Sequence, residues 1–156
     1  MPVPDFLLAL RSHVGHGLLP LVGVTAVVVN EEGEVLLHRR ADDGRWATPG
    51  GILEPEEEPA RAVVREVREE TGVEVEVERL TSVLAQEPFT YPNGDRVQFL
   101  DLAFRCRPVG GAPDASGDES LDVRWFPPRA LPDMPQRILD RIGHAHEDRP
   151  GPFYVT

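Results

Sequence analysis

Residues 65–73 read REVREETGV, and this stretch carries glutamates at positions 66, 69 and 70. Upstream, residues 59–64 read PARAVV, which supplies an apolar stripe at helical spacing and begins with a proline suited to a first helical turn. The glycine at position 72 is suited to ending the helix. We therefore predict a helix over residues 59–72, on which Glu66, Glu69 and Glu70 lie within an arc of about 100° on one face.

Three acids on one helical face repel one another. Like charges at i and i+4 destabilise a helix by about 0.2–0.5 kcal/mol per pair. One interpretation is a solvated surface on which Arg65 and Arg68 relieve the repulsion. The other is a site for divalent cations, because carboxylate oxygens are the ligands that hard cations such as Mg²⁺ prefer. The choice between them depends on the surrounding sequence.

The chain on either side of this helix alternates between strand and helix patterns. Residues 21–30 form a nearly continuous β-branched run, typical of a central strand, and we expect residues 34–40 to pair with them as a hairpin. Further strands are predicted at residues 73–86, 96–109 and 121–128, and further helices at about residues 4–14 and 134–147. With no long linker or internal repeat, the prediction is one α/β domain with a mixed sheet and helices on both sides.

The composition narrows the range of partners. The 156 residues include 16 basic and 27 acidic residues, which gives a net charge of −11, and every basic residue is arginine. We expect no nucleic-acid partner, because a field of this sign repels phosphate backbones, and no membrane partner, because no apolar run is long enough to span a bilayer. The single cysteine favours a cytoplasmic location. Packing or surface roles, rather than ligand roles, are expected for Cys106, His38, His144 and His146.

From residue 51 the chain follows the pattern G-x5-E-x7-R-E-U-x-E-E-x-G-U, where U is aliphatic. This pattern resembles the Nudix box, the signature of the Nudix hydrolases. All nine specified positions match: Gly51, Glu57, Arg65, Glu66, Val67, Glu69, Glu70, Gly72 and Val73. The resemblance covers roughly residues 20–145 and implies the Nudix fold, an α/β/α sandwich with a mixed central β-sheet. We assign residues 18–156 to a Nudix hydrolase domain, and residues 1–17 to an N-terminal helical extension that we consider a dimer contact.

The resemblance also implies a divalent-metal site, with Mg²⁺ or Mn²⁺ as the cofactor. Glu66 and Glu69 are the implied catalytic residues of the box, and an ion pair between Glu57 and Arg65 is implied to orient the glutamates. The implied metal ligands are Glu66, Glu69, Glu70 and, through its backbone carbonyl, Gly50.

Many Nudix hydrolases take a further acid, as metal ligand or general base, from a loop late in the fold. Residues 116–126 read SGDESLDVRWF and offer Asp118, Glu119 and Asp122. We choose Glu119 as the catalytic acid because of its position ahead of the tryptophan. A solvated acidic loop is the alternative interpretation, and Glu87 is a competing candidate.

Four side chains outside the box are candidate substrate contacts. Arg40 and Arg45 carry guanidinium groups whose geometry suits phosphates. Trp46 and Phe89 can stack on a base. Solvated arginines and packed aromatic residues are the alternative interpretations.

The family implies a nucleotide-type substrate, a nucleoside diphosphate linked to a moiety X. Pro88, 15 residues after Val73, resembles a feature of some ADP-ribose-cleaving members, and Tyr91, 18 residues after Val73, one of some dinucleoside polyphosphate hydrolases. We expect a metal-dependent pyrophosphohydrolase that acts on ADP-ribose or another nucleotide sugar, and we expect a homodimer. The alternatives are a nucleoside triphosphate pyrophosphohydrolase that cleanses the nucleotide pool and a non-catalytic domain that senses a nucleotide sugar.

Overall fold

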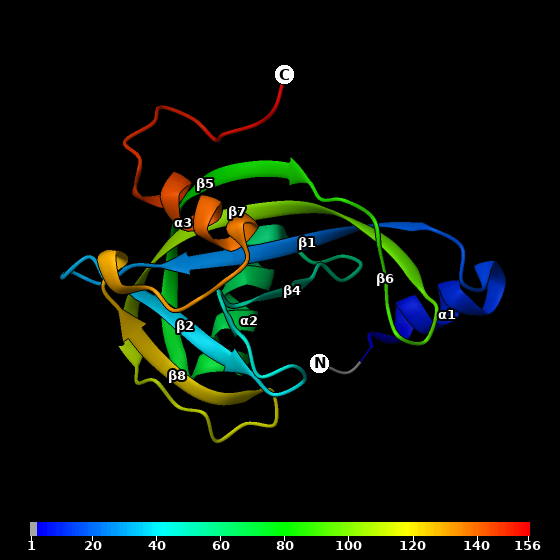
Figure 1. The fold of residues 1–156 in the computed structure, drawn as a ribbon, viewed down its shortest axis with the longest axis horizontal. Helices are drawn as coiled ribbons and strands as arrows, with labels where there is room; N and C mark the ends of the chain where they lie inside the picture. The colour runs from blue at the N-terminus through cyan, green and yellow to red at the C-terminus, as the bar shows by residue number, and fades with distance from the viewer. Residues whose placement is uncertain (1–2) are drawn as a thin grey trace.

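The computed structural model of the chain describes residues 3–156. Figure 1 shows a layer of strands between two helices, α2 and α3, with a third helix, α1, beyond one end of the layer. The helices are α1 (Asp5–Val14), α2 (Pro59–Thr71) and α3 (Gln136–His146), with a 3-10 turn η1 (Pro128–Ala130). The strands are β1 (Leu19–Val28), β2 (Val35–Arg40), β3 (Trp46–Ala47), β4 (Gly50–Ile52), β5 (Val73–Ala85), β6 (Phe89–Thr90), β7 (Arg96–Gly111) and β8 (Ser120–Phe126).

The strand layer consists of two sheets. A five-stranded sheet has the order β4-β1-β7-β5, with β6 pairing on β7, and a three-stranded sheet has the order β3-β2-β8. Strands β1 and β7 run parallel, from Leu19 opposite Val97 to Val28 opposite Cys106, and the other pairs are antiparallel. The larger sheet is therefore mixed, as predicted.

The prediction that residues 21–30 and 34–40 pair along their length as a hairpin is wrong. A tight turn is present, but β1 and β2 meet only at a bridge between Val29 and Val35. A strand has two hydrogen-bonding edges, and those of β1 are occupied by β4 and β7. Strand β2 therefore diverges from β1 and pairs with β8 in the second sheet.

The two faces of the strand layer pack against different helices. On β1, Val24, Ala26 and Val28 lie in the hydrophobic cluster that contains the apolar stripe of α2. The alternate residues Val27 and Val29 lie in the cluster that contains α3. Because successive side chains of a strand point to opposite faces, this arrangement gives the predicted α/β/α sandwich.

Helix α1 packs on the end of the layer where β1 and β7 begin (Figure 1). Its Leu7 is buried with Leu21 and Val97. Its Arg11 donates a hydrogen bond of 2.8 Å to the backbone O of Arg96 and lies 3.5 Å from Asp95. Within the predicted extension over residues 1–17, residues 5–14 are helical and pack on their own chain, residues 1 and 2 lie outside the described residues, and the division of the chain at residue 17 stays a prediction. In the described part of the chain, no helix is long and apolar enough to cross a membrane.

Candidate functional site

Helix α2 buries two of its three box glutamates. Glu66 and Glu70 are 4% and 3% exposed, whereas the Glu69 side chain is 52% exposed. The buried Val63 and Val67 belong to the same face of the helix, so the stripe that packs α2 on the sheet carries Glu66 and Glu70 inward with it. A solvated surface therefore explains neither of these two acids.

Two glycines let strand β4 pass close to the Glu66 side chain of α2 and to the backbone of β1. A Cβ atom on Gly51 would lie 2.2 Å from Oε1 of Glu66, and one on Gly50 would lie 2.2 Å from the backbone O of Val24. The backbone N–H of Gly50 donates a hydrogen bond of 2.8 Å to Oε2 of Glu70. The two glycines thus bring the backbone of β4 into contact with both buried carboxylates.

Arg65 connects the acids of the box. Its Nε and Nη2 atoms donate to Glu57 at 2.8 and 3.0 Å, and its Nη1 donates to Glu66 at 2.9 Å and to Glu69 at 3.2 Å. Through these bonds Glu57 raises the pKa of Arg65, and Arg65 lowers the pKa of Glu57. The structure contains the predicted ion pair, and its role in orienting metal ligands stays a prediction.

Burial shifts the pKa values of the two inner glutamates in the same direction. It raises the pKa of Glu70 to about 8, and the negative charges of Glu66 and Glu119 add to the shift. Burial also raises the pKa of Glu66, where Arg65 opposes the shift. A divalent cation would offset the unfavourable energy of ionising two desolvated carboxylates on adjacent turns.

The donor atoms fit a hard divalent cation, since all are carboxylate or carbonyl oxygens. Within residues 3–156, no three His, Cys, Asp or Glu side chains already converge as a metal site. Arg65 holds Glu66 and Glu69, and the N–H of Gly50 holds Glu70. The metal-ligand roles of the three glutamates and of the Gly50 carbonyl therefore stay predictions.

His38 is a site residue that the sequence did not reveal. It is buried on β2, with Nε2 3.7 Å from Oε2 of Glu70 and Nδ1 2.8 Å from Oγ of Ser120. Ser120 donates its own hydrogen to the backbone O of Glu70 at 2.6 Å, so Nδ1 of His38 is the donor to Ser120. Burial lowers the pKa of His38 to about 4, so the neutral ring presents Nε2 to Glu70 as an acceptor. A lone histidine in a strand carries no spacing signal that could have identified it.

The loop before β8 brings Glu119 to the glutamates. Glu119 lines a small cavity of about 30 Å³ together with Glu70 and Asp118, and its charge raises the pKa of both Glu66 and Glu70. Asp122 instead lies 2.6 Å from an arginine on its own strand. Glu119 is therefore the loop acid best located for catalysis, and that role stays a prediction.

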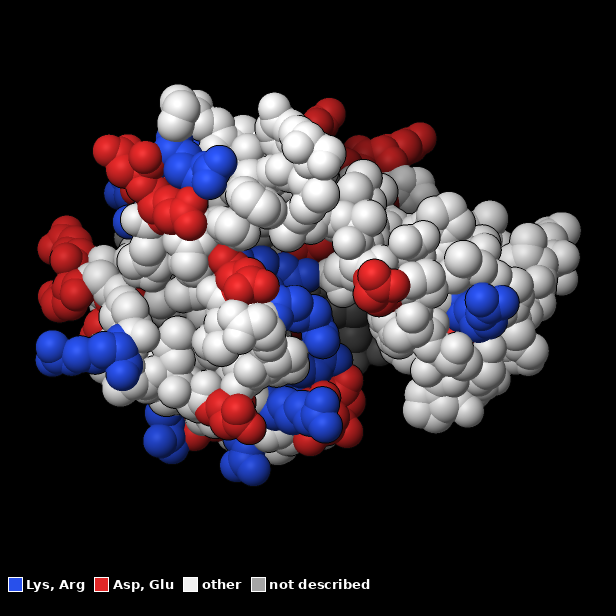
Figure 2. Space-filling view, turned by 45° about the horizontal axis from the view of Figure 1, so that its top comes forward, with Lys and Arg blue, Asp and Glu red and all other residues white. Residues whose placement is uncertain are grey.

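A cleft of about 690 Å³ opens beside β4, with Gly50 and Gly51 in its wall. Figure 2 shows this face of the molecule hollowed at its centre, with arginines gathered along one side of the hollow. The cleft brings together the four predicted substrate contacts, Arg40, Arg45, Trp46 and Phe89. Among residues 3–156, Glu87 and Pro88 are not part of the cleft wall.

The aromatic side chains of the cleft differ in how far they are committed to the core. The Trp46 ring packs edge-on against Phe126, with ring centres 4.9 Å apart, so it also serves the core. Phe89 is exposed and packs against Tyr91 at 4.8 Å and against Phe99 at 6.1 Å. Both Tyr91 and Phe99 also line the cleft, which gives it an aromatic wall beside β6.

Three further cleft residues escaped the sequence interpretation. Helix α3 contributes Arg137 and Arg141, and β7 contributes the buried Asp101. Arg141 lies 2.7 Å from Oδ2 of Asp101, whose Oδ1 accepts a hydrogen bond of 2.8 Å from Thr25. Helical spacing predicted an amphipathic helix here, but it carries no indication of which polar residues face a cleft formed by distant segments.

The three-layer α/β/α sandwich, with the buried glutamates of the sequence pattern on α2, is the arrangement expected of a Nudix hydrolase. The model of the NUDIX domain matches residues 19–146. This match covers most of the chain, and the chain belongs to the Nudix family, whose members hydrolyse pyrophosphate bonds.

Named relatives agree with this assignment. The chain is 47% identical to a MutT-like protein of Streptomyces ambofaciens over 80% of this chain and 78% of that protein. It is 37% identical to the human 8-oxo-dGDP phosphatase NUDT18 over 75% of this chain, and it spans 35% of the human protein's length. A crystal structure of a UDP-X diphosphatase superposes with a TM-score of 0.69 and 23% identity, covering 96% of this chain and 74% of that chain, and supports the fold.

Proposed function

We propose that the protein is a Mg²⁺- or Mn²⁺-dependent pyrophosphohydrolase that cleaves a phosphoanhydride bond in a nucleoside diphosphate derivative. The observation that carries the proposal is the pair of buried carboxylates, Glu66 and Glu70, set against the two glycines that form part of the cleft wall. A bound divalent metal would neutralise phosphate charge and lower the pKa of a water molecule.

The surrounding residues hold these carboxylates in position. Arg65 fixes Glu66 and Glu69 from one side, and the N–H of Gly50 fixes Glu70 from the other. Ser120, oriented by His38, bonds the backbone O of Glu70 and ties β8 to the end of α2. Phosphoryl transfer depends mainly on positioning and charge neutralisation, which such a supported site supplies.

Proton transfer from the attacking water requires a base near the glutamates. Glu119 is the candidate that we propose, because its charge acts on both Glu66 and Glu70 and its side chain lines the small cavity beside Glu70. Because the loop acid varies in position between Nudix hydrolases, its role needs a separate test: Glu119→Gln should lower kcat much more than it changes KM.

Two classes of nucleotide are candidate substrates. ADP-ribose or another nucleotide sugar was preferred on the position of Pro88, but Pro88 is exposed and lies outside the cleft wall. The 37% identity to an 8-oxo-dGDP phosphatase supports the second class, nucleoside phosphates with an oxidised base. The aromatic wall of Phe89, Tyr91 and Phe99 suits base stacking in either class.

The test is a substrate panel with Mg²⁺ and with Mn²⁺, read by mass spectrometry. It contains ADP-ribose, other nucleotide sugars, dinucleoside polyphosphates, and normal and oxidised nucleoside di- and triphosphates. We expect turnover of one class that disappears with a chelator and in Glu70→Gln. Tight nucleotide binding by folded, metal-loaded protein without any turnover would instead support the sensor alternative. The expected cytoplasmic location and absence of nucleic-acid binding stay predictions.

A further inference from the structure

The wall of the cleft is more positive than the protein as a whole. Five arginines and four aspartates line the cleft, so its wall is net positive by one charge, whereas the chain carries −11. These charged residues are Arg11, Arg40, Arg45, Arg137 and Arg141, with Asp42, Asp43, Asp95 and Asp101.

Two of these arginines remain without an acidic partner. The other three arginines take up all four aspartates, each within 4 Å. Arg40 lies beside Asp42 and Asp43, Arg11 lies beside Asp95, and Arg141 lies beside Asp101. Within residues 3–156, no carboxylate lies within salt-bridge distance of Arg45 or Arg137. Both side chains are exposed at the cleft and free to meet an anion.

The unpartnered arginines belong to one electrostatic cluster. Partial desolvation, and then the positive charges of Arg141, Arg45 and Arg40, lower the pKa of Arg137. Arg40 also lines the small cavity that contains Glu70 and Glu119. The basic wall therefore continues from α3 to the edge of the glutamate cluster.

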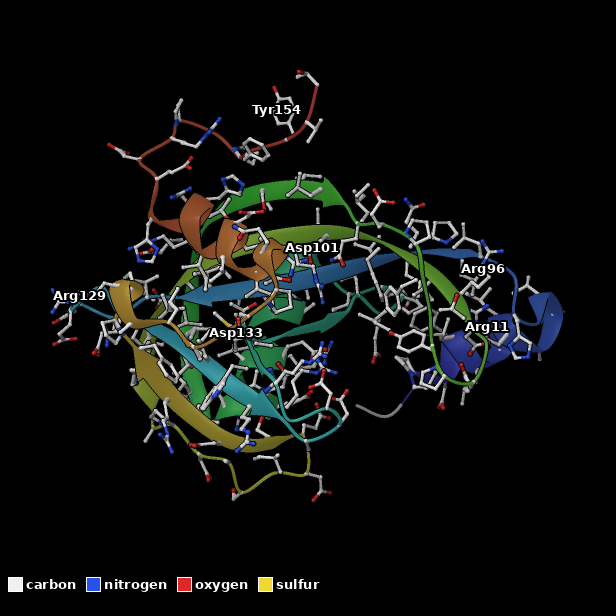
Figure 3. All side chains as sticks on the ribbon, viewed as in Figure 1. Arg11, Arg96, Asp101, Arg129, Asp133 and Tyr154 are labelled. Carbon is white, nitrogen blue, oxygen red and sulfur yellow. The ribbon has the colours of Figure 1, made fainter. Side chains whose placement is uncertain are left out.

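Helix α3, which carries Arg137 in its first turn, is anchored to the sheet through Arg141. Arg141, one turn further along, is 8% exposed and held by Asp101 at 2.7 Å, and Figure 3 shows Asp101 beside α3. Pro135, at the N-terminal end of α3, lies in the same cleft wall, and a helix N-terminus carries partial positive charge. Arg137 is thus presented by an anchored helix at the end that favours anions.

We propose that Arg137, together with Arg45, forms a phosphate-binding subsite for a phosphate group of the substrate beyond the two phosphates of the scissile bond. This inference rests on the proposed function and selects among its substrates. A nucleoside triphosphate or a longer polyphosphate carries such a group, whereas a nucleoside diphosphate sugar with an unphosphorylated sugar does not. The subsite therefore favours a nucleoside triphosphate or a longer polyphosphate over a nucleotide sugar and over a nucleoside diphosphate.

Binding of inorganic tripolyphosphate without divalent metal tests the subsite apart from catalysis. Isothermal titration calorimetry would compare wild type, Arg137→Gln and the control Arg129→Gln. Arg129 is exposed on η1, outside the cleft wall and at the opposite end of the molecule from α1 (Figure 3). We expect Arg137→Gln to weaken binding by about ten-fold or more and Arg129→Gln to leave it unchanged, because a charge-assisted bond to phosphate is lost in the first variant alone. Equal affinity in all three proteins would overturn the proposal.

Kinetics then test the substrate class. For a nucleoside triphosphate, Arg137→Gln should lower kcat/KM by about ten-fold, mainly through KM, while kcat/KM for ADP-ribose changes less than about two-fold. An equal loss for both substrates would contradict the assigned position of the subsite. If wild type hydrolyses nothing, the proposed function fails, and the tripolyphosphate titration still decides whether the subsite exists. Urea unfolding of Arg137→Gln should match that of wild type.

Discussion

At the scale of single residues, the lack of a side chain at Gly51 leaves the space that the Glu66 carboxylate occupies. A Cβ atom there would lie 2.2 Å from a Glu66 oxygen, so Gly51→Ala must displace the carboxylate. We expect Mn²⁺ affinity to fall about 10–100-fold, as when a metal ligand loses its orientation. The free energy of unfolding should fall by only about 1 kcal/mol, because the displaced atoms are the flexible end of a side chain. Electron paramagnetic resonance of Mn²⁺ and urea unfolding would measure the two effects.

Gly143→Ala is the matched control for this substitution. Its Cβ atom would meet nothing within 4 Å, and Gly143 lies inside α3. Replacing glycine within a helix should stabilise the protein by about 0.5–1 kcal/mol and leave Mn²⁺ affinity unchanged. Unchanged Mn²⁺ binding by Gly51→Ala would show that the carboxylate has another productive position.

The raised pKa of the buried Glu70 predicts how the free energy of unfolding of the metal-free protein depends on pH. Its pKa rises from 4.5 to about 8 on folding, so the folded state binds this proton more tightly than the unfolded chain. Stability from this group is therefore complete below about pH 4.5 and is lost as the pH rises towards 8. Across that window Glu70→Gln should become more stable relative to wild type by on the order of 2–5 kcal/mol.

Urea unfolding with a chelator, repeated from pH 5 to 8.5, measures this difference. Glu32→Gln is the control, because Glu32 is exposed in the turn before β2, outside the glutamate cluster, and its difference from wild type supplies the baseline. Parallel curves for wild type and Glu70→Gln would contradict the assigned burial of Glu70.

At the scale of elements, a buried ion pair adds to the hydrophobic packing that holds α3 on the sheet. Arg141 and Asp101 are both nearly fully buried, and Thr25 on β1 bonds the same carboxylate. Asp101→Ala would leave the charge of Arg141 buried without a partner, and we expect a loss of about 3–5 kcal/mol in unfolding free energy. Glu76→Ala, which removes an exposed pair with Arg107, should lose less than about 1 kcal/mol. Similar losses in chemical denaturation would mean that the buried pair anchors nothing.

How far the sequence predicts these elements depends on how local each signal is. The helix predicted over residues 59–72 is α2, because its apolar spacing, its proline and its terminal glycine all act within one segment. The hairpin failed because the choice of partner for β1 depends on β4 and β7, which are distant in sequence. Arg137 and Asp101 were missed for the same reason, since the cleft exists only once α1, β7 and α3 have been brought together.

At the scale of the whole molecule, α1 retains an apolar surface after packing on its own chain. Leu8 is 54% exposed, and the neighbouring Leu10, Val14 and Leu18 are exposed as well. We propose this surface as the contact of the expected homodimer. Leu8→Asp should then convert dimers to monomers in multi-angle light scattering. Deleting residues 1–17 is a less clean test, because Leu7 and Arg11 also line the cleft. A monomeric wild type would rule the dimer out.

The order of the strands also constrains how the chain folds as it is synthesised. Strand β1 lies at the centre of the larger sheet, yet both of its partners come later in the chain, and its parallel partner β7 begins only at Arg96. A nascent chain that ends before β7 leaves an apolar strand with one open edge, a state that favours association with other chains. The centre of the larger sheet can therefore form only after β7 has left the ribosome, and pairing between strands so distant in sequence is slow.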